Sequence, residues 1–154
     1  MQLVESTRVR AAPGDVSRFF EEMEESYSRW HPDHVTFRWL DGGRLEAGAE
    51  ANFEERIGGK LQQKTVRSIE VDLDRYIEFE PTSWGVALSM PHISFTIDQQ
   101  PDGCEVTQRI SVRTGPIGAW LNRQEFEAVR RHMREEAENL KRILEAESKV
   151  PSDA

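Results

Sequence analysis

The alternation of apolar and polar positions predicts one strand, one or two helices, a long run of strands and a closing helix. Residues 2–10 alternate with a period of two, which is typical of a strand. The segment "AAPGD" interrupts this pattern, and we expect Asp15 to cap the helix that follows. The apolar face of that helix comprises Val16, Phe19, Phe20 and Met23.

A pattern typical of strands begins at His34 and continues for about 80 residues. The segments with strand character are "HVTFRWL", "AEANFEERI", "LQQKTVRSIEV", "RYIEFE", "GVALSM", "HISFTID" and "CEVTQRISVRT". Short turns rich in Gly, Asp and Pro separate them, which favours roughly six strands in an antiparallel meander. In the first segment we expect Val35, Phe37 and Trp39 to share one side.

A closing helix is expected from Ala119 to Glu147. Its apolar positions recur at helical spacing and are Phe126, Val129, Met133, Ala137, Leu140 and Leu144. A helix keeps an apolar face over so many turns only if another surface covers it. We therefore expect an α+β helix-grip fold, in which a curved antiparallel sheet wraps around this helix. A single domain would occupy residues 1–148, with 149–154 as a frayed tail.

Composition and charge exclude several classes of partner and compartment. The net charge of −8 and the pI of about 5.1 argue against nucleic acid or an anionic membrane as the main partner. No apolar run is long enough to span a bilayer, and the first residues lack the apolar core of a signal peptide. The single cysteine, Cys104, rules out an intramolecular disulfide, so we expect a cytoplasmic protein. The oligomeric state is not determined by the sequence.

A histidine and a glutamate lie one turn apart at the edge of the closing helix's apolar stripe. At about 100° per residue, Glu136 falls between Val129 and Ile143, and His132 falls on the same flank. Glu135 falls on the opposite side and should face water. A buried carboxylate is costly unless it is paired or binds a metal, so the pair predicts half of a metal site. The alternative is a structural or solvated pair.

Two other segments carry side chains of the same chemistry. Glu55 shares strand parity with Phe53 and Ile57, so it should point inward. A salt bridge to an inward Arg or Lys is the alternative explanation for this residue. The segment "RWHPDHV" places His31 and His34 where the first helical region meets the meander. Imidazole and carboxylate groups are ligands that suit zinc.

Nearly the whole chain resembles the START/Bet v 1-like superfamily, also called the SRPBCC or polyketide cyclase-like group. The resemblance rests on "VESTRVRAAPGDVSRFF", which is similar to its opening strand and helix, and on the closing helix. It implies a helix-grip fold with a ligand cavity between the sheet and the long helix, and a small hydrophobic or aromatic molecule as the partner.

Three motifs, "RWHPDH", "FEERIGG" and "HMREEAENL", resemble the metal-dependent branch that includes diacetylphloroglucinol hydrolase and phloretin hydrolase. The resemblance implies a divalent metal, most often zinc, held by two His and two Glu. His132 and Glu136 match the helix positions, and Glu55 matches the strand position. The fourth ligand stays open: the place directly after Trp30 favours His31, whereas a hairpin through the "DGGR" turn would bring His34 nearly opposite Glu55.

The resemblance also implies hydrolysis of a carbon–carbon bond next to a ketone, on a small apolar oxygenated compound such as an acylated phenol. His34 and Glu136 are the candidates for moving the proton. The candidate ligand-binding residues are Trp30, Phe53, Tyr76, His92 and Val129. For His92, a strand parity opposite to that of Ile93 favours an outward position. The alternative functions are a non-catalytic binding protein for a hydrophobic small molecule, and a polyketide cyclase or dehydrase without metal.

Overall fold

The computed structural model describes residues 1–82 and 92–148. The strand expected at "GVALSM" and the tail 149–154 lie outside the described residues. The strands are β1 (Gln2–Val9), β2 (His34–Trp39), β3 (Glu50–Ile57), β4 (Lys60–Asp72), β5 (Tyr76–Pro81), β6 (His92–Gln100) and β7 (Gly103–Ser111). The helices are α1 (Pro13–Glu21), α2 (Met23–Trp30), α4 (Pro116–Leu121) and α5 (Arg123–Ser148), with a short 3₁₀ turn at Leu40–Gly42.

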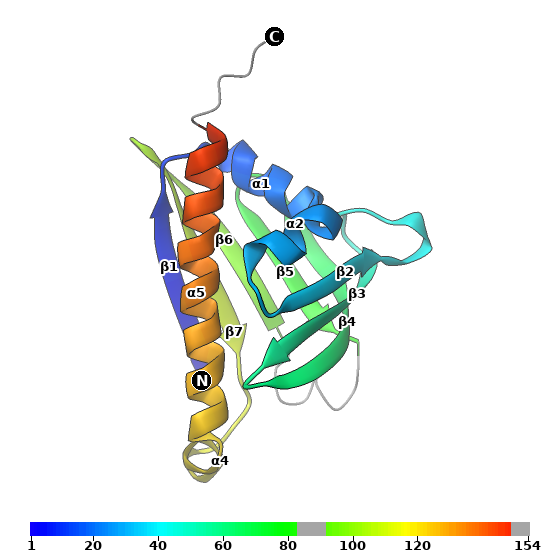
Figure 1. Cartoon of the computed structure of the whole chain (residues 1–154), viewed down its shortest axis with the longest axis vertical. Coiled ribbons are helices and arrows are strands. Elements are labelled where there is room, and N and C mark those ends of the chain that lie inside the picture. The colour runs from blue at the N-terminus through cyan, green and yellow to red at the C-terminus, as the bar shows by residue number, and fades with distance from the viewer. Residues whose placement is uncertain (83–91, 149–154) are drawn as a thin grey trace.

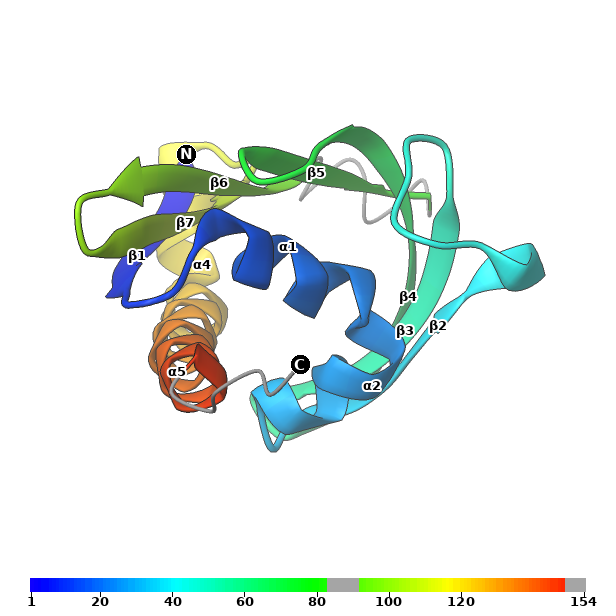
Figure 2. The same ribbon diagram turned by 90° about the horizontal axis from the view of Figure 1, so that it is seen from above.

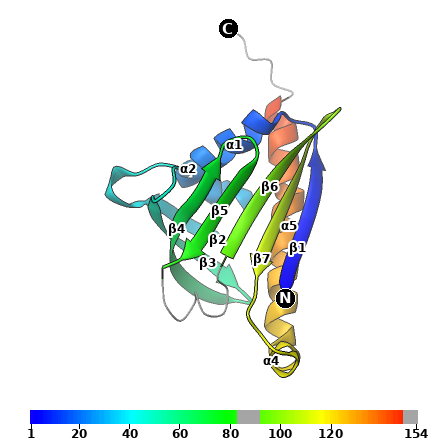
Figure 3. The same cartoon turned by 180° about the vertical axis from the view of Figure 1, so that it is seen from behind.

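The strands form one seven-stranded antiparallel sheet in the order β1-β7-β6-β5-β4-β3-β2. Every neighbour pair except β1–β7 is consecutive in the described chain, so the sheet is the expected meander with the first strand added at its far edge. The sheet is strongly curved, and α1, α2 and α5 lie on its concave side (Figures 1 and 2). Seen from behind, its strands cover α5 and the two short helices (Figure 3). The predicted α+β helix-grip architecture is confirmed.

Aromatic side chains hold α1 and α2 against the sheet. Phe20 is 1% exposed, and its ring centroid lies 4.6 Å from that of Phe95 on β6. Trp30, the last residue of α2, packs edge-to-face against Phe20 at 5.8 Å. Burial of such large rings dominates the stability of a core of this size. The predicted apolar face of α1 is therefore the face that contacts the sheet.

The first helix begins earlier than its expected cap. It starts at Pro13, and Ala12 is the N-cap residue. Proline suits the first helical position because it has no N–H to leave unsatisfied. Asp15 is the third residue of the helix, and its Oδ2 accepts a hydrogen bond from the N–H of Ala12 at 3.1 Å. The side chain expected as the cap thus still satisfies the backbone at this end of the helix, from inside the first turn.

The closing helix is interrupted near its start. The expected helix from Ala119 is in fact α4, which ends at Leu121, and α5, which starts at Arg123. Asn122 separates them, and both its backbone N–H and its side-chain amide donate to the carbonyl of Gly118, at 3.0 and 2.9 Å. Asparagine favours such local bonds over a regular helix. The interruption lets α4 point in a direction of its own (Figure 1).

The β2–β3 hairpin turns a histidine inward. His34 pairs with Glu55, and Phe37 pairs with Phe53, with a bulge between His34 and Thr36. A bulge adds one residue to a strand and thereby changes which face the following side chains occupy. His34 is 4% exposed, whereas Val35, expected to share a side with Phe37, is the half-buried residue within the bulge. The hairpin therefore delivers both His34 and Glu55 to the interior.

Candidate functional site

A cavity of about 750 Å³ lies between the concave face of the sheet and α5. Apolar side chains form most of its wall, including Phe20, Phe53, Phe79, Phe95, Val129 and Met133. Trp30, another expected ligand-binding residue, also lines it. A cavity of this size and character accommodates a small organic molecule and orients it through a few polar groups.

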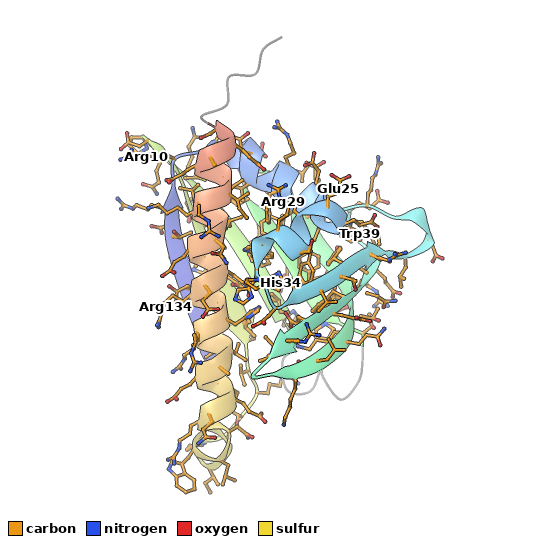
Figure 4. The ribbon with its side chains drawn as sticks, viewed as in Figure 1. Arg10, Glu25, Arg29, His34, Trp39 and Arg134 are labelled. Carbon is orange, nitrogen blue, oxygen red and sulfur yellow. The ribbon has the colours of Figure 1, made fainter. Side chains whose placement is uncertain are left out.

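Four polar side chains gather on the wall between β2, β3 and α5. The Nε2 atoms of His34 and His132 are 3.0 Å apart. Glu136 places Oε1 3.2 Å from Nε2 of His132 and Oε2 3.6 Å from Nε2 of His34. Glu55 places Oε2 3.7 Å from Nε2 of His132. All four residues line the cavity, and in Figure 4 His34 lies between α5 and the start of β2, whereas Arg134 projects from the outer side of α5.

A hydrogen bond at Nδ1 fixes the tautomer of His34. Nδ1 lies 2.9 Å from the backbone carbonyl of Tyr27, and a carbonyl can only accept, so Nδ1 carries the proton. Nε2 therefore presents a lone pair to the cluster. The imidazole also stacks on the ring of Tyr27, with centroids 4.0 Å apart and planes at 6°. Burial, and then the neighbouring His132, lower the pKa of His34 to about 3, so it is neutral near pH 7.

Glu55 is held by two residues on the sheet side of the cavity. The hydroxyl of Tyr27 donates to its Oε2 at 3.2 Å, and Nζ of Lys64 lies 3.4 Å from its Oε1. The predicted inward direction is confirmed, since the Glu55 side chain is only 13% exposed and faces the cavity. The alternative salt bridge is also present, with Lys64 as its partner. Burial, followed by the charge of Glu55, raises the pKa of the Tyr27 hydroxyl, which keeps it a donor.

The α5 pair is buried as the helical wheel predicts. His132 and Glu136 are 7% and 6% exposed, whereas the side chain of Glu135 is 45% exposed. Burial raises the pKa of Glu136 well above its usual range, and the charge of Glu55 raises it further. Burial likewise lowers the pKa of His132, partly offset by Glu55. Trp30 anchors this turn of helix, because its Nε1–H donates to the backbone carbonyl of Glu136 at 2.9 Å.

His31 lies beside the cluster but uses both ring nitrogens elsewhere. Its Nδ1 accepts the backbone N–H of Asp33 at 2.9 Å, and its Nε2 lies 2.5 Å from Oε2 of Glu135. His31, Asp33 and His132 could also bring three ligand atoms together, as could His34, Glu55 and His132. In the second set, the lone pair on Nε2 of His34 is not used by a hydrogen bond to any described residue outside the cluster. For the fourth ligand position, which the sequence left open, the geometry therefore favours His34 over His31.

Two expected ligand-binding residues lie outside the cavity. Tyr76 and His92 do not line it, although Trp30, Phe53 and Val129 do. Ile77 is fully buried on the inner face of β5, so its neighbour Tyr76 points to the outer face. His92 has the outward parity noted in its sequence, and its Nδ1 lies 3.1 Å from Oε1 of Glu78. The assignment of these two residues to the cavity was wrong, because alternate strand positions face opposite sides of the sheet.

The sequence patterns do not single out two residues that contact the cluster. Tyr27 supports it through its hydroxyl, its ring and its backbone carbonyl, and Lys64 supports it through Glu55. Strand parity contains a signal for Lys64, which shares the buried side of β4 with Val66 and Ser68. For Tyr27 the signal is its place seven residues before His34, on the buried side of α2.

The fold and cavity define the class of this chain as a helix-grip protein with an internal cavity. Residues 1–145 match the model of the family described as "Polyketide cyclase / dehydrase and lipid transport". The chain belongs to this family. Among its described helices, none is both long enough and apolar enough to cross a membrane. A comparison with curated proteins finds no match.

Solved structures with the same fold come from several organisms. The protein TTHA0849 from Thermus thermophilus has a TM-score of 0.76 at 14% identity, covering 97% of this chain and all of that one. The Polyketide_cyc-like protein Cgl2372 from Corynebacterium glutamicum has a TM-score of 0.61 at 14% identity, over 99% and 96% of the two chains. Major latex-like protein 151 from Panax ginseng gives 0.62 at 14%, over 86% and 96%. Identities this low establish the fold alone.

Proposed function

We propose that His34, Glu55, His132 and Glu136 hold a divalent metal ion, best matched by zinc, in an enzyme that hydrolyses a small apolar oxygenated compound. The observation that carries this proposal is the contact of two imidazole Nε2 atoms beside two carboxylates in a buried site. His34 has its proton on Nδ1, so its Nε2 offers a lone pair. Such a concentration of acceptor atoms is stabilised by a cation.

The spacing of the donor atoms supports a tetrahedral ion. Ligands at 2.0–2.2 Å from zinc in tetrahedral geometry are about 3.3–3.6 Å from one another. The nitrogen–nitrogen distance between His34 and His132 is 3.0 Å, and the distances from these nitrogens to Glu136 and Glu55 are 3.2, 3.6 and 3.7 Å. His34, Glu55 and His132 each bring one ligand atom within 4.8 Å of the other two, and Glu136 would complete the set from α5.

A bound divalent ion would supply Lewis acidity and, provided that it takes water as a fifth ligand beside the four side chains, a water molecule of lowered pKa. The chain's own residues would prepare the site for it. Tyr27 and Lys64 hold the carboxylate of Glu55 in place, and the carbonyl of Tyr27 aims the lone pair of His34. Groups of this kind orient metal ligands and fix their tautomers. Burial favours a proton on Glu136 in the metal-free protein, and binding of the ion would release that proton, because a carboxylate ligates a metal in its ionised form.

The cavity restricts the substrate to a small, mostly apolar molecule. Phe53, Val129 and Met133 line the space beside the cluster, and Gln108 adds a half-buried amide on the β7 side. A ring with oxygen substituents would place its oxygens at the cluster and its apolar part against these walls. An acylated phenol, split at the carbon–carbon bond next to its ketone, agrees with this shape and with the motifs "RWHPDH", "FEERIGG" and "HMREEAENL".

A cyclase or dehydrase without metal is the second candidate. It is favoured by the hydrogen bonds that the cluster can form on its own. A protonated Glu136 can donate to His132, and Glu55 has both Tyr27 and Lys64 as donors. A positioned neutral acid of this kind is sufficient for general acid catalysis.

An assay with an acylated phenol separates the two candidates. Protein treated with a chelator and then dialysed should release no carboxylic acid from the substrate, and Zn²⁺ should restore the reaction. The variant Glu135→Gln, changed one position away on the exposed side of α5, should behave as the wild type. Equal hydrolysis before and after chelation would contradict a role of the metal ion in the reaction, and absence of hydrolysis even with Zn²⁺ would favour the metal-free candidate.

A further inference from the structure

The short helix α4 carries an exposed apolar surface. Ile117, Trp120 and Leu121 are 76%, 63% and 68% exposed, although α4 has only six residues. They are three of the seven large hydrophobic residues that are exposed in the described part of the chain. Large apolar side chains gathered in this way on a surface usually mark a contact with another body. We call these three residues the α4 patch.

The α4 patch lies at the mouth of the cavity. The exposed residues that line the cavity come from two places, the β3–β4 hairpin and the segment around α4. They are Gly58, Lys60, Arg113, Asn122, Gln124 and Glu125. The hairpin and α4 lie at the same end of the molecule, opposite α1 (Figures 1 and 3). An apolar ligand that enters or leaves the cavity between these elements passes beside the patch.

The charge around the α4 patch differs from that of the whole chain. The chain has 28 acidic and 20 basic residues, yet no acidic residue lies between Glu105 and Glu125. Arg113 and Arg123 flank α4, and the guanidinium of Arg123 lies 5.2 Å from the centre of the Trp120 ring. The expectation that an acidic protein avoids anionic surfaces therefore does not apply to this end of the molecule.

We propose that the α4 patch docks on an anionic lipid surface, from which the cavity takes up its apolar ligand. Tryptophan is enriched at the boundary between lipid and water, where its ring is buried and its N–H stays hydrated. Isoleucine and leucine side chains beside it add buried apolar area, and adjacent arginines attract anionic headgroups. The α4 patch and the two arginines that flank α4 bring these groups together beside one cavity mouth. The contact is peripheral and reversible.

Co-sedimentation with lipid vesicles tests this proposal. The full chain is mixed with vesicles of phosphatidylglycerol and phosphatidylcholine, and separately with phosphatidylcholine alone, at low salt. The test variant combines Ile117→Ser, Trp120→Ser and Leu121→Ser. The matched control is Leu73→Ser, which changes a side chain that is 46% exposed in the turn between β4 and β5, at the other end of the molecule. Circular dichroism melting verifies that each variant is folded.

The wild type and Leu73→Ser should partition onto anionic vesicles, with weaker binding to phosphatidylcholine alone. The triple variant should lose at least about tenfold in partition coefficient, because its inserting apolar groups are gone. Absence of vesicle binding by the wild type, or equal binding by the triple variant, would overturn the proposal. A concentration-dependent dimer that only the triple variant abolishes, without vesicle binding, would assign the patch to a second copy of the chain and also overturn it. None of these measurements depends on a metal ion.

Discussion

The Nε2 atom of His34 lies 3.0 Å from the Nε2 atom of His132, although 98 residues separate them in the chain. One histidine comes from a bulged strand and the other from the closing helix. Two imidazole nitrogens at this distance must share a proton or a cation. The contact therefore connects the helix-grip fold directly to the chemistry proposed for the cavity.

Replacing Glu136 by Gln should weaken zinc binding by more than about 100-fold, since even groups that only support metal ligands contribute 10- to 100-fold. The amide keeps the shape of the side chain but removes the charge that faces Nε2 of His132 at 3.2 Å. Titration of chelator-treated protein with Zn²⁺ measures the change. Glu135→Gln is the control, and equal affinity of the two variants would show that Glu136 is not a ligand.

Replacing Tyr27 by Phe should lower zinc affinity by about 10-fold and leave the ligands themselves intact. The variant loses the hydrogen bond from the hydroxyl to Glu55 but keeps the ring that stacks on His34. The free energy of unfolding should fall by about 0.5–1.5 kcal/mol, the usual net value of one hydrogen bond. Tyr76→Phe, on the outer face of β5, should preserve metal affinity; a similar loss in both variants would contradict this role of Tyr27.

The metal-free protein should lose stability as the pH falls from about 6.5 toward 3, because of His34. In the folded chain the pKa of His34 is lowered to about 3 from 6.5, so within this window the unfolded chain binds the proton more readily. Glu136 acts in the opposite direction. Because its pKa is raised in the folded chain, its contribution to the free energy of unfolding declines as the pH rises above 4.5.

Urea unfolding of chelator-treated wild type and His34→Gln between pH 4 and 7 isolates the histidine. The variant should show a smaller loss of unfolding free energy toward low pH, since it lacks the group that protonates on unfolding. The readout is the slope of the free energy of unfolding against pH, so a loss of stability that is the same at every pH leaves the result unchanged. Parallel curves would mean that His34 is not buried in its neutral form.

Filling the cavity should block an apolar ligand without removing the metal. Val129 lines the cavity and lies one helical turn before the cluster on α5. Val129→Trp should therefore reduce the binding of a hydrophobic fluorescent probe by at least about tenfold, a loss typical of displaced apolar contact. Zinc content should stay as in the wild type. Val4→Trp, at a position that is 51% exposed on β1, is the control; an equal loss in it would mean that the probe binds outside the cavity.

Periodicity was sufficient to predict the architecture because each long element buries one face. The stripe from Met133 to Leu144 identified the helix that the sheet grips, and the strand segments indicated the meander. The break at Asn122 was not predicted, because the apolar residues before it continue the helical spacing while pointing to solvent. Periodicity reports which side chains are apolar, and does not report whether anything covers them.

The residues of the candidate site were predictable where the periodicity of a single helix or strand determines which way the side chain points. The inward position of Glu136 on α5 follows from the helical wheel, and that of Glu55 on β3 follows from strand parity. The choice between His31 and His34 depended on a bulge that reverses the parity of His34, and the sequence has no clear signal for it. The contribution of Tyr27 depends on the packing of α2 against β2, which a pattern within one element cannot reveal.

The metal content of the purified, untagged protein is the measurement that tests the central proposal most directly. Inductively coupled plasma mass spectrometry of the wild type should find about one equivalent of zinc per chain, as a four-ligand site of this chemistry retains its ion at micromolar concentration. The double variant His132→Ala, Glu136→Ala should contain none. Wild-type protein that binds no divalent ion, even after incubation with micromolar zinc, would contradict the metal site and leave the cavity as a binding or acid–base site.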